Sequence, residues 1–480
     1  MSVENHFACR NAAVVVVAAL LCIPAARAMD VFGAYQDLPA SPAVNAALAT
    51  RAWGCVFASV PSSPLSLEEA IERALCSNPR TSEAWAEIKL QASRVGISKS
   101  AYLPTLSMTL ERDGRDIDTT VPSDRQLDSG GLQVSSTQAL IFNWVIFDPS
   151  RGFDVNGNES LLEAARANHA DVLLSVFADL SHDFFAAQAA AAALTAATDL
   201  KVTAQSIYLA AKSRADRGVA PITDALQAQT ALAEAELAFA RAQGNLGTAT
   251  GSLAWRMGLS PYIPIVLAGT QDNAIVAPPS GDAIEELISR VQDMHPHAVQ
   301  AARQLDAARA RVQQARADML PKVSLNLRAG HDSTPVTPYT GSVPIDARGR
   351  SRTASLSVSV PLFEGFSTNY RIDQAERSME VSRAQLDEAR QQVANDAWMA
   401  YQSVRTAYST FDQSRQLLAT AQASFEAANE RYRAGVGSIA DLLGAQAALT
   451  NADNRKLQAL SDWRSANASL WTRLAQIRTS

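Results

Sequence analysis

Residues 431–446 read RYRAGVGSIADLLGAQ. The first four of them are the end of a 69-residue segment, Phe366–Ala434, that contains neither glycine nor proline. Such a segment predicts one helix of roughly 100 Å at 1.5 Å per residue, far longer than the helices of globular domains. Gly435 and Gly437 then supply the backbone freedom that a tight reversal needs. The stretch therefore predicts a long helix, an abrupt turn at about 434–441 and a returning helix.

The same pattern occurs a second time in the chain. RGVAPITDALQAQ at Arg217–Gln229 repeats its Gly-Val pair, isoleucine, aspartate, leucine and glutamine at an offset of 217 residues. The same offset relates LEEAIER at Leu67–Arg73 to IEELISR at Ile284–Arg290. One offset kept over so much of the chain indicates a tandem duplication. The expected units are repeat 1 at 65–259, a proline-rich linker at 260–282 and repeat 2 at 283–480.

Each repeat has two stretches of alternating apolar residues after a Leu-Pro pair that ends its first helix. Alternation predicts strands with one apolar face, and a loop rich in Gly, Pro, Thr and Asp separates the two strands. A long helix, a tip turn and a return helix follow, and small residues at coiled-coil spacing favour laterally packed helices. The expected strands are 104–114 and 130–147, then 321–331 and 351–363, with tip turns at 217–224 and 434–441.

The N-terminus has the pattern of a secretory signal peptide, expected at residues 1–28. An apolar run at 12–23 precedes the small-x-small cleavage sequence ARA at 26–28. Residues 29–64 would then form an N-terminal arm of the exported protein. The bulky Leu21 does not suit a lipoprotein cleavage site before Cys22, so no lipid anchor is expected.

Two cysteines, Cys55 and Cys76, remain after removal of the expected signal peptide. An exported protein meets an oxidising compartment, where disulfides form and persist. A disulfide that ties the arm to the first helix and a pair of free buried thiols are both compatible with the sequence.

Composition and motifs argue against nucleic-acid binding and against catalysis. The chain of 480 residues carries a formal net charge of −6, without the basic surface that nucleic acid requires. Its six histidines include one close pair, His295 and His297, and no zinc motif, nucleophile motif or phosphate loop accompanies them. We therefore expect no enzyme activity, no metal and no cofactor.

Four amphipathic strands in an exported protein are too few for a membrane barrel. Strands that cross a lipid bilayer must close into a barrel, and barrels begin at about eight strands. Three copies of this chain would supply twelve. The count therefore predicts a homotrimer with a shared 12-stranded β-barrel and a long α-helical tube beneath it.

The order of the duplicated motifs resembles the TolC family of outer-membrane channel proteins. The resemblance rests on the LEEAIERAL openings, the Leu-Pro switches, IFDPSRG and LFEGF after the second strands, and the two turn sequences, and it covers Pro64 to the C-terminus. It implies a mainly α fold with β, a trimeric barrel in the outer-membrane lipid, and a helical tunnel that extends into the periplasm. It also implies docking to a periplasmic adaptor (membrane fusion) protein and an inner-membrane transporter.

The sequence is compatible with three alternative functions. Over the whole chain, the sequence is similar to the outer-membrane component of a type I secretion system for a large protein toxin of the cyclolysin type. That channel would be a passive duct for a protein cargo driven by an ABC transporter. The first alternative is efflux of drugs or small molecules with a proton-driven pump. The second is a periplasmic adaptor protein, which would have a shorter hairpin and β-rich domains.

The resemblance also assigns roles to the two aspartates that follow the turns. Asp224 and Asp441 would face the pore at its closed periplasmic tip, so that three protomers present six carboxylates that select cations. Stabilisation of a helix N-terminus is the alternative role, because an acidic side chain in a first turn favours the macrodipole.

By the same resemblance, Tyr432 with Thr223 and Asp224 would form a latch that holds the tip shut. Gly437 and Gly444 stand where the best-known member of the family has an arginine and a second aspartate, so we expect a weaker closed state. Adaptor tips would dock at the turn residues Gly218, Val219, Gly435, Val436 and Gly437.

Overall fold

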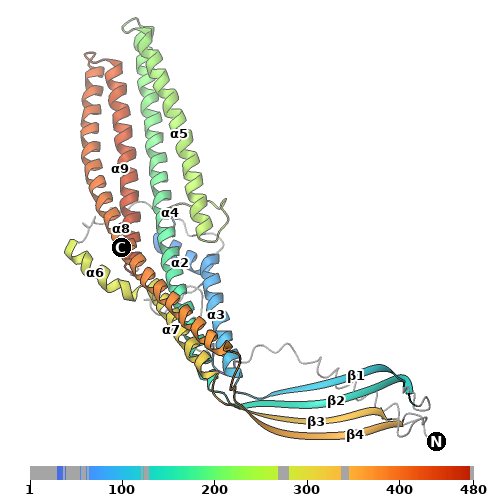
Figure 1. Cartoon of the computed structure of the whole chain (residues 1–480). Coiled ribbons are helices and arrows are strands. Elements are labelled where there is room, and N and C mark those ends of the chain that lie inside the picture. Colours follow the sequence, from blue (N-terminus) through green and yellow to red (C-terminus); the bar gives the residue numbers. More distant parts are fainter. Residues whose placement is uncertain are drawn as a thin grey trace.

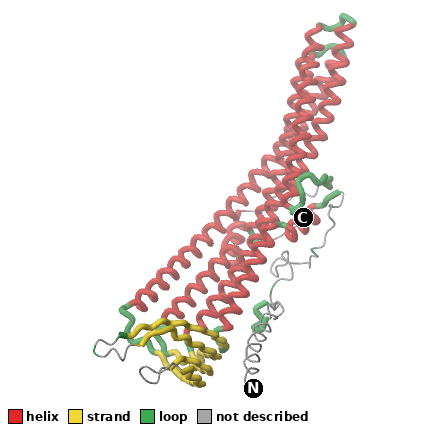
Figure 2. The backbone as a smooth tube through the Cα atoms, turned by 90° about the vertical axis from the view of Figure 1, so that its right-hand side faces the viewer, coloured by secondary structure: helices red, strands yellow, loops and turns green. Residues whose placement is uncertain are grey.

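The computed structural model describes residues 30–35, 38, 55, 61, 64–120, 123, 129–268, 281–336 and 345–475. The expected signal peptide and most of the expected arm lie outside these residues. Two long helical hairpins extend side by side at one end of the molecule, and a curved sheet lies at the other end (Figure 1). Shorter helices pack around the lower halves of the two longest helices (Figure 2).

The two repeats have the same helices. Each hairpin pairs a helix of 67 residues with one of 35 residues: α4 (Ser150–Asp216) with α5 (Ile222–Arg256), and α8 (Ser367–Arg433) with α9 (Ile439–Arg473). All four bounds of the second hairpin follow those of the first by 217 residues. The duplication seen in the sequence is therefore a duplication of structure.

Short helices precede the strands in both repeats. They are α2 (Leu67–Ser77) and α3 (Pro79–Ser100), then α6 (Gly281–Met294) and α7 (Pro296–Ala317). A proline begins the second helix of each pair, and a side chain at the preceding residue caps it. Asn78 Oδ1 accepts from the Arg80 amide at 2.9 Å, and His295 Nδ1 accepts from the His297 amide at 3.2 Å. Proline at the first helical position and a capping side chain together fix each junction.

The strands form one antiparallel sheet in the order β1-β2-β3-β4. Their bounds are β1 Thr105–Thr119, β2 Ser129–Phe147, β3 Lys322–Val336 and β4 Ile345–Ser359. Strands β1 and β3 extend beyond their expected ends, whereas β4 begins and ends earlier than expected. Backbone pairing defines a strand and needs no apolar side chain, so the ladder continues into the polar loop sequences.

One face of the sheet is apolar across all four strands. The register places Leu106 opposite Phe142, Phe142 opposite Leu327, and Leu325 opposite Leu356. Leu106 and Leu356 are 71% and 66% exposed in the single chain. Serines and asparagines alternate with them on the other face, where the Ser324 and Ser357 hydroxyls lie 2.7 Å apart. The sheet thus presents an uncovered apolar face of the kind that lipid or a partner covers.

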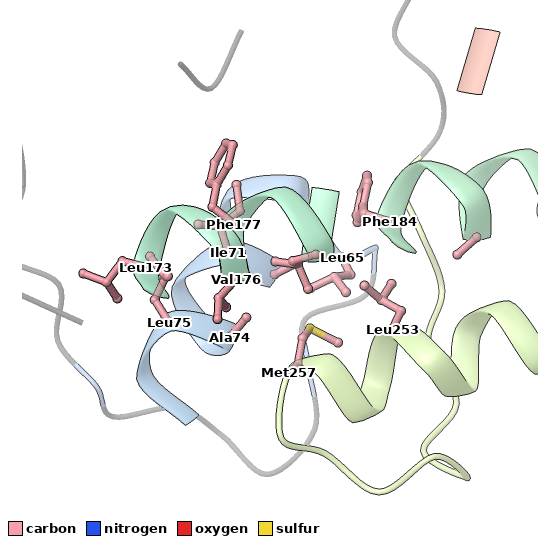
Figure 3. Packing of buried hydrophobic residues seen from close by; sticks show 13 residues of the cluster. Leu65, Ile71, Ala74, Leu75, Leu173, Val176, Phe177, Phe184, Leu253 and Met257 are labelled. Carbon is pink, nitrogen blue, oxygen red and sulfur yellow. The ribbon is translucent and has the colours of Figure 1, made fainter. Parts of the chain in front are cut away.

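The main apolar core lies where α2, α4 and α5 meet. Ile71, Phe177, Leu253 and Met257 are fully or almost fully buried there, and Leu65 joins them from the chain before α2 (Figure 3). A second core repeats this arrangement between α6, α8 and α9. Members that follow residues of the first core by 217 positions include Val393, Ala397, Tyr401, Leu470 and Leu474.

A disulfide joins Cys55 to Cys76, with their Cα atoms 5.5 Å apart. It attaches residue 55 to the last turn of α2, next to the first core. Of the two states that the sequence left open, the structure therefore contains the bonded one. Among the described helices, none combines the length and the apolar composition that crossing a membrane would require.

Candidate functional site at the hairpin tips

Both hairpins reverse through a glycine in the left-handed region. Gly218 has φ of 71° and Gly435 has φ of 78°. The amide after each glycine donates back into the last helical turn, from Val219 to the Arg214 carbonyl and from Val436 to the Arg431 carbonyl, both at 3.0 Å. Only glycine adopts this conformation without strain, so the two turns depend on it.

Gly437 fits a second tight contact in the α8–α9 turn. A β-carbon built on it would lie 3.0 Å from the Tyr432 nitrogen and 3.1 Å from the Arg431 carbonyl carbon. In this turn, a side chain at 437 would therefore force the backbone to shift. The glycine at position 437, where the best-known family member has an arginine, therefore agrees with the packing of this turn.

A small apolar cluster below the turns joins the two hairpins. It contains residues of all four hairpin helices: Ile207, Ala211, Ala228, Tyr432, Ile439 and Leu442. Alanine side chains supply part of the contact, so the buried apolar area is modest. The hairpins of one chain thus touch at their tips through few large side chains.

Tyr432 is the polar member of this cluster and is only 7% exposed. The guanidinium carbon of Arg214 lies 5.0 Å from the centre of its ring, and Arg214 Nη1 donates to the Tyr432 carbonyl at 3.1 Å. The Tyr432 hydroxyl is buried and has no hydrogen-bond partner among the described residues. Within one chain, the structure therefore does not pair this hydroxyl with Thr223 or Asp224.

Asp224 and Asp441 lie in the first turns of α5 and α9. Asp224 is half-buried and Asp441 is exposed, and neither carboxylate has a hydrogen bond or an ion pair within the described part of the chain. The Asp441 amide donates to Ser438 Oγ at 3.1 Å, which caps α9. Both aspartates are placed to favour the helix macrodipole, and both carboxylates remain available to a ligand or a neighbouring protomer.

Above the core, the space between the two hairpins is a groove with mixed polar and apolar walls. Its volume is about 800 Å³, and its lining includes the charged residues Asp199, Arg241, Asp453 and Asp462 beside leucines, alanines and Phe425. No group of three or more potential metal-ligating side chains gathers anywhere in the described residues.

Ion pairs join the two helices of each hairpin at equivalent positions, at the end of the hairpin that is opposite to the turn. Arg256 binds Asp179 at 3.1 Å and Asp183 at 2.8 Å, which joins α5 to α4. At the same offset, Arg473 binds Asp396 at 3.1 Å and joins α9 to α8. Because these pairs lie far from the turns, they position the tips without touching them.

His295 lies at the start of α7, where it is buried and where the charges of Arg473 and Asp396 act on it. Burial lowers the pKa of His295 below its ordinary value, while Asp171, 3.9 Å away, acts in the opposite direction. His297 and Arg473 lower the pKa further, and Asp396 raises it. A depressed histidine pKa favours the neutral imidazole, so its stabilisation is complete above about pH 6.5 and is lost as the pH falls toward the folded-state pKa.

Replacing His295 with asparagine, the residue at the equivalent Asn78, is expected to keep the helix cap and remove this pH dependence. The thermal unfolding midpoints of the purified wild-type and H295N proteins would be compared at about pH 7.5 and about pH 5.5. The wild type should lose more stability on acidification than the variant. An equal loss in both proteins would contradict the assignment.

Sequence reasoning did not single out Arg214. It occupies the position equivalent to Arg431, four residues before the turn glycine in each repeat. The repeated spacing could have marked both arginines as residues of the tip. Only the folded chain shows that Arg214, and not Arg431, contacts the other hairpin.

The sequence model of the family described as "Outer membrane efflux protein" matches residues 70–259 and 287–476, again 217 residues apart. Protein CyaE of Bordetella pertussis is 32% identical over 450 residues, covering 92% of this chain and 86% of CyaE. Outer membrane protein TolC of Escherichia coli is 24% identical over 402 residues, 81% of this chain and 77% of TolC.

A solved structure of the outer-membrane channel OprN has the same fold. It superposes with a TM-score of 0.70 at 19% identity, covering 88% of this chain and 96% of the OprN chain. The predicted TolC-like architecture is therefore confirmed, and the expected alternative of a periplasmic adaptor is not supported. Members of this family are passive channels of the outer membrane, and their helical part extends into the periplasm. The chain belongs to the outer membrane efflux protein family and is an outer-membrane protein.

Proposed function

We propose that this protein is the outer-membrane duct of a tripartite type I secretion system. Three copies would pair their sheets edge to edge, because β1 and β4 are the outer strands of an open four-stranded sheet. The resulting barrel of twelve strands would turn its apolar face to lipid. The helical hairpins would continue as a tunnel through the periplasm, with the tips at its entrance.

The observation that carries the proposal is the separation of the two ends of one elongated chain. The sheet with its exposed apolar face lies at one end (Figure 1). The two hairpin tips lie at the other end, and each has one aspartate in the first turn of its returning helix. A duct that crosses both the outer membrane and the periplasm needs these two ends and the long helices between them. It needs no catalytic group, so the duct itself catalyses nothing.

The tips supply the entrance in this proposal. Asp224 and Asp441 of three protomers would form the ring of six carboxylates that selects cations. The turn residues Gly218, Val219, Gly435, Val436 and Gly437 would receive the adaptor, and Val219 and Val436 are 74% and 72% exposed. Contacts around Tyr432, together with Thr223 and Asp224 across the entrance, would keep the tip closed at rest.

A polypeptide cargo, such as a protein toxin, is favoured by the names of relatives. The alkaline protease secretion protein AprF of Pseudomonas aeruginosa is 30% identical over 171 residues, 35% of this chain and 34% of AprF. The toluene efflux pump protein TtgC of Pseudomonas putida is 22% identical over 394 residues. In this proposal an ABC transporter and a periplasmic adaptor drive the cargo. Efflux of small molecules with a proton-driven pump is the second candidate, on the strength of the TtgC similarity.

Deleting the gene in its source bacterium separates the two candidates. Under the secretion proposal, at least one large protein should disappear from the culture medium and accumulate in the cells, while drug sensitivity stays unchanged. Restoring the intact gene should restore the secreted protein. Increased drug sensitivity with an unchanged set of secreted proteins would instead support efflux and contradict the proposal.

A further inference from the structure

We propose that Arg214 is a positioning residue that clamps the two hairpins of each protomer together and so holds the entrance closed. The clamp rests on the proposed function, because it acts on the entrance of the proposed duct. Arg214 lies in the last turn of α4, in repeat 1, yet its side chain contacts Tyr432 at the end of α8, in repeat 2. It is therefore a bridge between repeats at the tip.

The Arg214 guanidinium has two contacts on the other hairpin, both with Tyr432, and it lies beside the turn glycine Gly435. Nη1 donates to the Tyr432 carbonyl at 3.1 Å, the guanidinium carbon lies 5.0 Å from the Tyr432 ring centre, and Nη2 lies 3.6 Å from the position of a β-carbon on Gly435. A planar cation can stack on an aromatic face while its N–H groups donate in the same plane. The ring, the carbonyl and the turn glycine thus form one surface that fits the guanidinium.

The acceptor of this hydrogen bond is one of the last carbonyls at the end of α8. The last carbonyls of a helix lack a partner in the next helical turn and carry the negative end of the helix macrodipole, which favours a cation, even where a turn amide also donates to them. The Tyr432 carbonyl also accepts from the Gly435 amide at 3.1 Å, so the clamp and the turn share one acceptor. A change in the turn at Gly435 would therefore disturb the clamp directly.

The duplication supplies an internal comparison. Arg431 is the equivalent of Arg214, but it is exposed, and among the described residues its side chain has no hydrogen bond or ion pair. The residue equivalent to Tyr432 is Ala215, which offers no ring to a guanidinium. The bridge therefore runs in one direction only, from repeat 1 to repeat 2.

The other contact between the two hairpins near the turns is the apolar cluster around Tyr432, in which Ile207 of α4 meets Ile439 and Leu442 of α9. The cluster around Tyr432 includes two alanines, Ala211 and Ala228, and the tyrosine hydroxyl has no partner among the described residues. Any widening of the entrance that separates the two hairpins must break the contacts of Arg214. The clamp works through the tyrosine ring and carbonyl, and the hydroxyl contributes nothing to it.

The test compares purified trimers of the full-length exported protein in planar lipid bilayers. Arg214→Ala should raise the resting conductance by about tenfold, because it removes one stacked contact and one charge-assisted hydrogen bond. Arg431→Ala removes the equivalent charge without the bridge and should conduct like the wild type. Arg214→Lys, which keeps the charge but loses the planar fork, should give an intermediate conductance.

Tyrosine variants separate the clamp from a closure that depends on the hydroxyl. Tyr432→Phe keeps the ring and loses only the hydroxyl that a latch with Thr223 and Asp224 would use, so it should be far less leaky than Tyr432→Leu, which should be as leaky as Arg214→Ala. Equal conductance of the Arg214→Ala and Arg431→Ala channels would overturn the clamp. So would a Tyr432→Phe channel as leaky as Tyr432→Leu, because the hydroxyl would then hold the tip.

Thermal unfolding of the trimers separates an effect on the gate from an effect on folding. The thermal midpoints of the trimers should be unchanged by Arg214→Lys and Tyr432→Phe, so that their conductances report on the gate rather than on folding. If Arg214→Ala does not fold, a wild-type conductance for Arg214→Lys together with a Tyr432→Phe channel as leaky as Tyr432→Leu would overturn the proposal. If the wild type itself forms no channels, the proposed function fails, and that result is distinct from a failure of the clamp.

Discussion

Replacing Gly258 with alanine is expected to destabilise the protein by about 3 kcal/mol or more, because the change combines a steric clash with backbone strain. Gly258 follows α5 with φ of 71°, and a β-carbon on it would lie 2.7 Å from the Ser77 carbonyl oxygen and 3.1 Å from the Ser77 β-carbon. The end of α2 would have to move away from α5. The thermal unfolding midpoint in detergent, at a fixed protein concentration, measures the effect.

Gly247 provides the matched control within α5. Nothing lies within 4 Å of a β-carbon at this helical position, so Gly247→Ala should stabilise the protein by up to about 1 kcal/mol. In the second repeat, Ala475 stands at the equivalent of Gly258 with φ of 53°. An alanine can thus adopt this conformation, and the clash with Ser77 is the larger part of the expected loss. Equal midpoints for the two variants would contradict this account.

Replacing both Asp224 and Asp441 with asparagine is expected to remove the cation preference of the channel. Six carboxylates in a narrow entrance favour cations over anions, so the permeability ratio should fall severalfold toward one. The reversal potential of single trimers in a potassium chloride gradient measures this ratio. The amide side chains keep the size of the aspartates, so pore width should change little.

Glu430→Gln is the control, because it neutralises an exposed carboxylate near the same tip, 3.6 Å from Arg433. It should leave the permeability ratio unchanged. The alternative role for the aspartates is stabilisation of the α5 and α9 N-termini. In that case, the Asp224→Asn, Asp441→Asn variant would lose thermal stability but keep its selectivity, and the carboxylate ring would be wrong.

The long helices and the duplication could be predicted because their signals are local. A run without glycine or proline, ended by a glycine turn, predicts a helix whatever surrounds it, and α8 ends at Arg433, directly before the expected turn. The strand ends were less predictable. Residues such as Asp113 and Gly114 join β1 only because β2 pairs with them, and pairing leaves no apolar pattern in the sequence.

The tip contacts could be predicted only in part. The positions of Asp224 and Asp441 follow from the repeated turn sequence, since both come directly after a reversal. The contact between Arg214 and Tyr432 joins residues 218 apart, and it depends on how the two hairpins pack. No local pattern distinguishes Arg214 from Arg431, so the bridge could be found only in the folded chain.

The most direct measurement of the central claim is capture of a polypeptide inside the duct. A photocrosslinking residue would replace Asp441 at the proposed entrance, and Leu356 on the apolar sheet face as a control, in cells whose secreted protein is stalled during export. The account predicts a crosslink to the stalled protein from position 441 and none from position 356. A protein that stalls during export and gives no crosslink from position 441 would contradict the account.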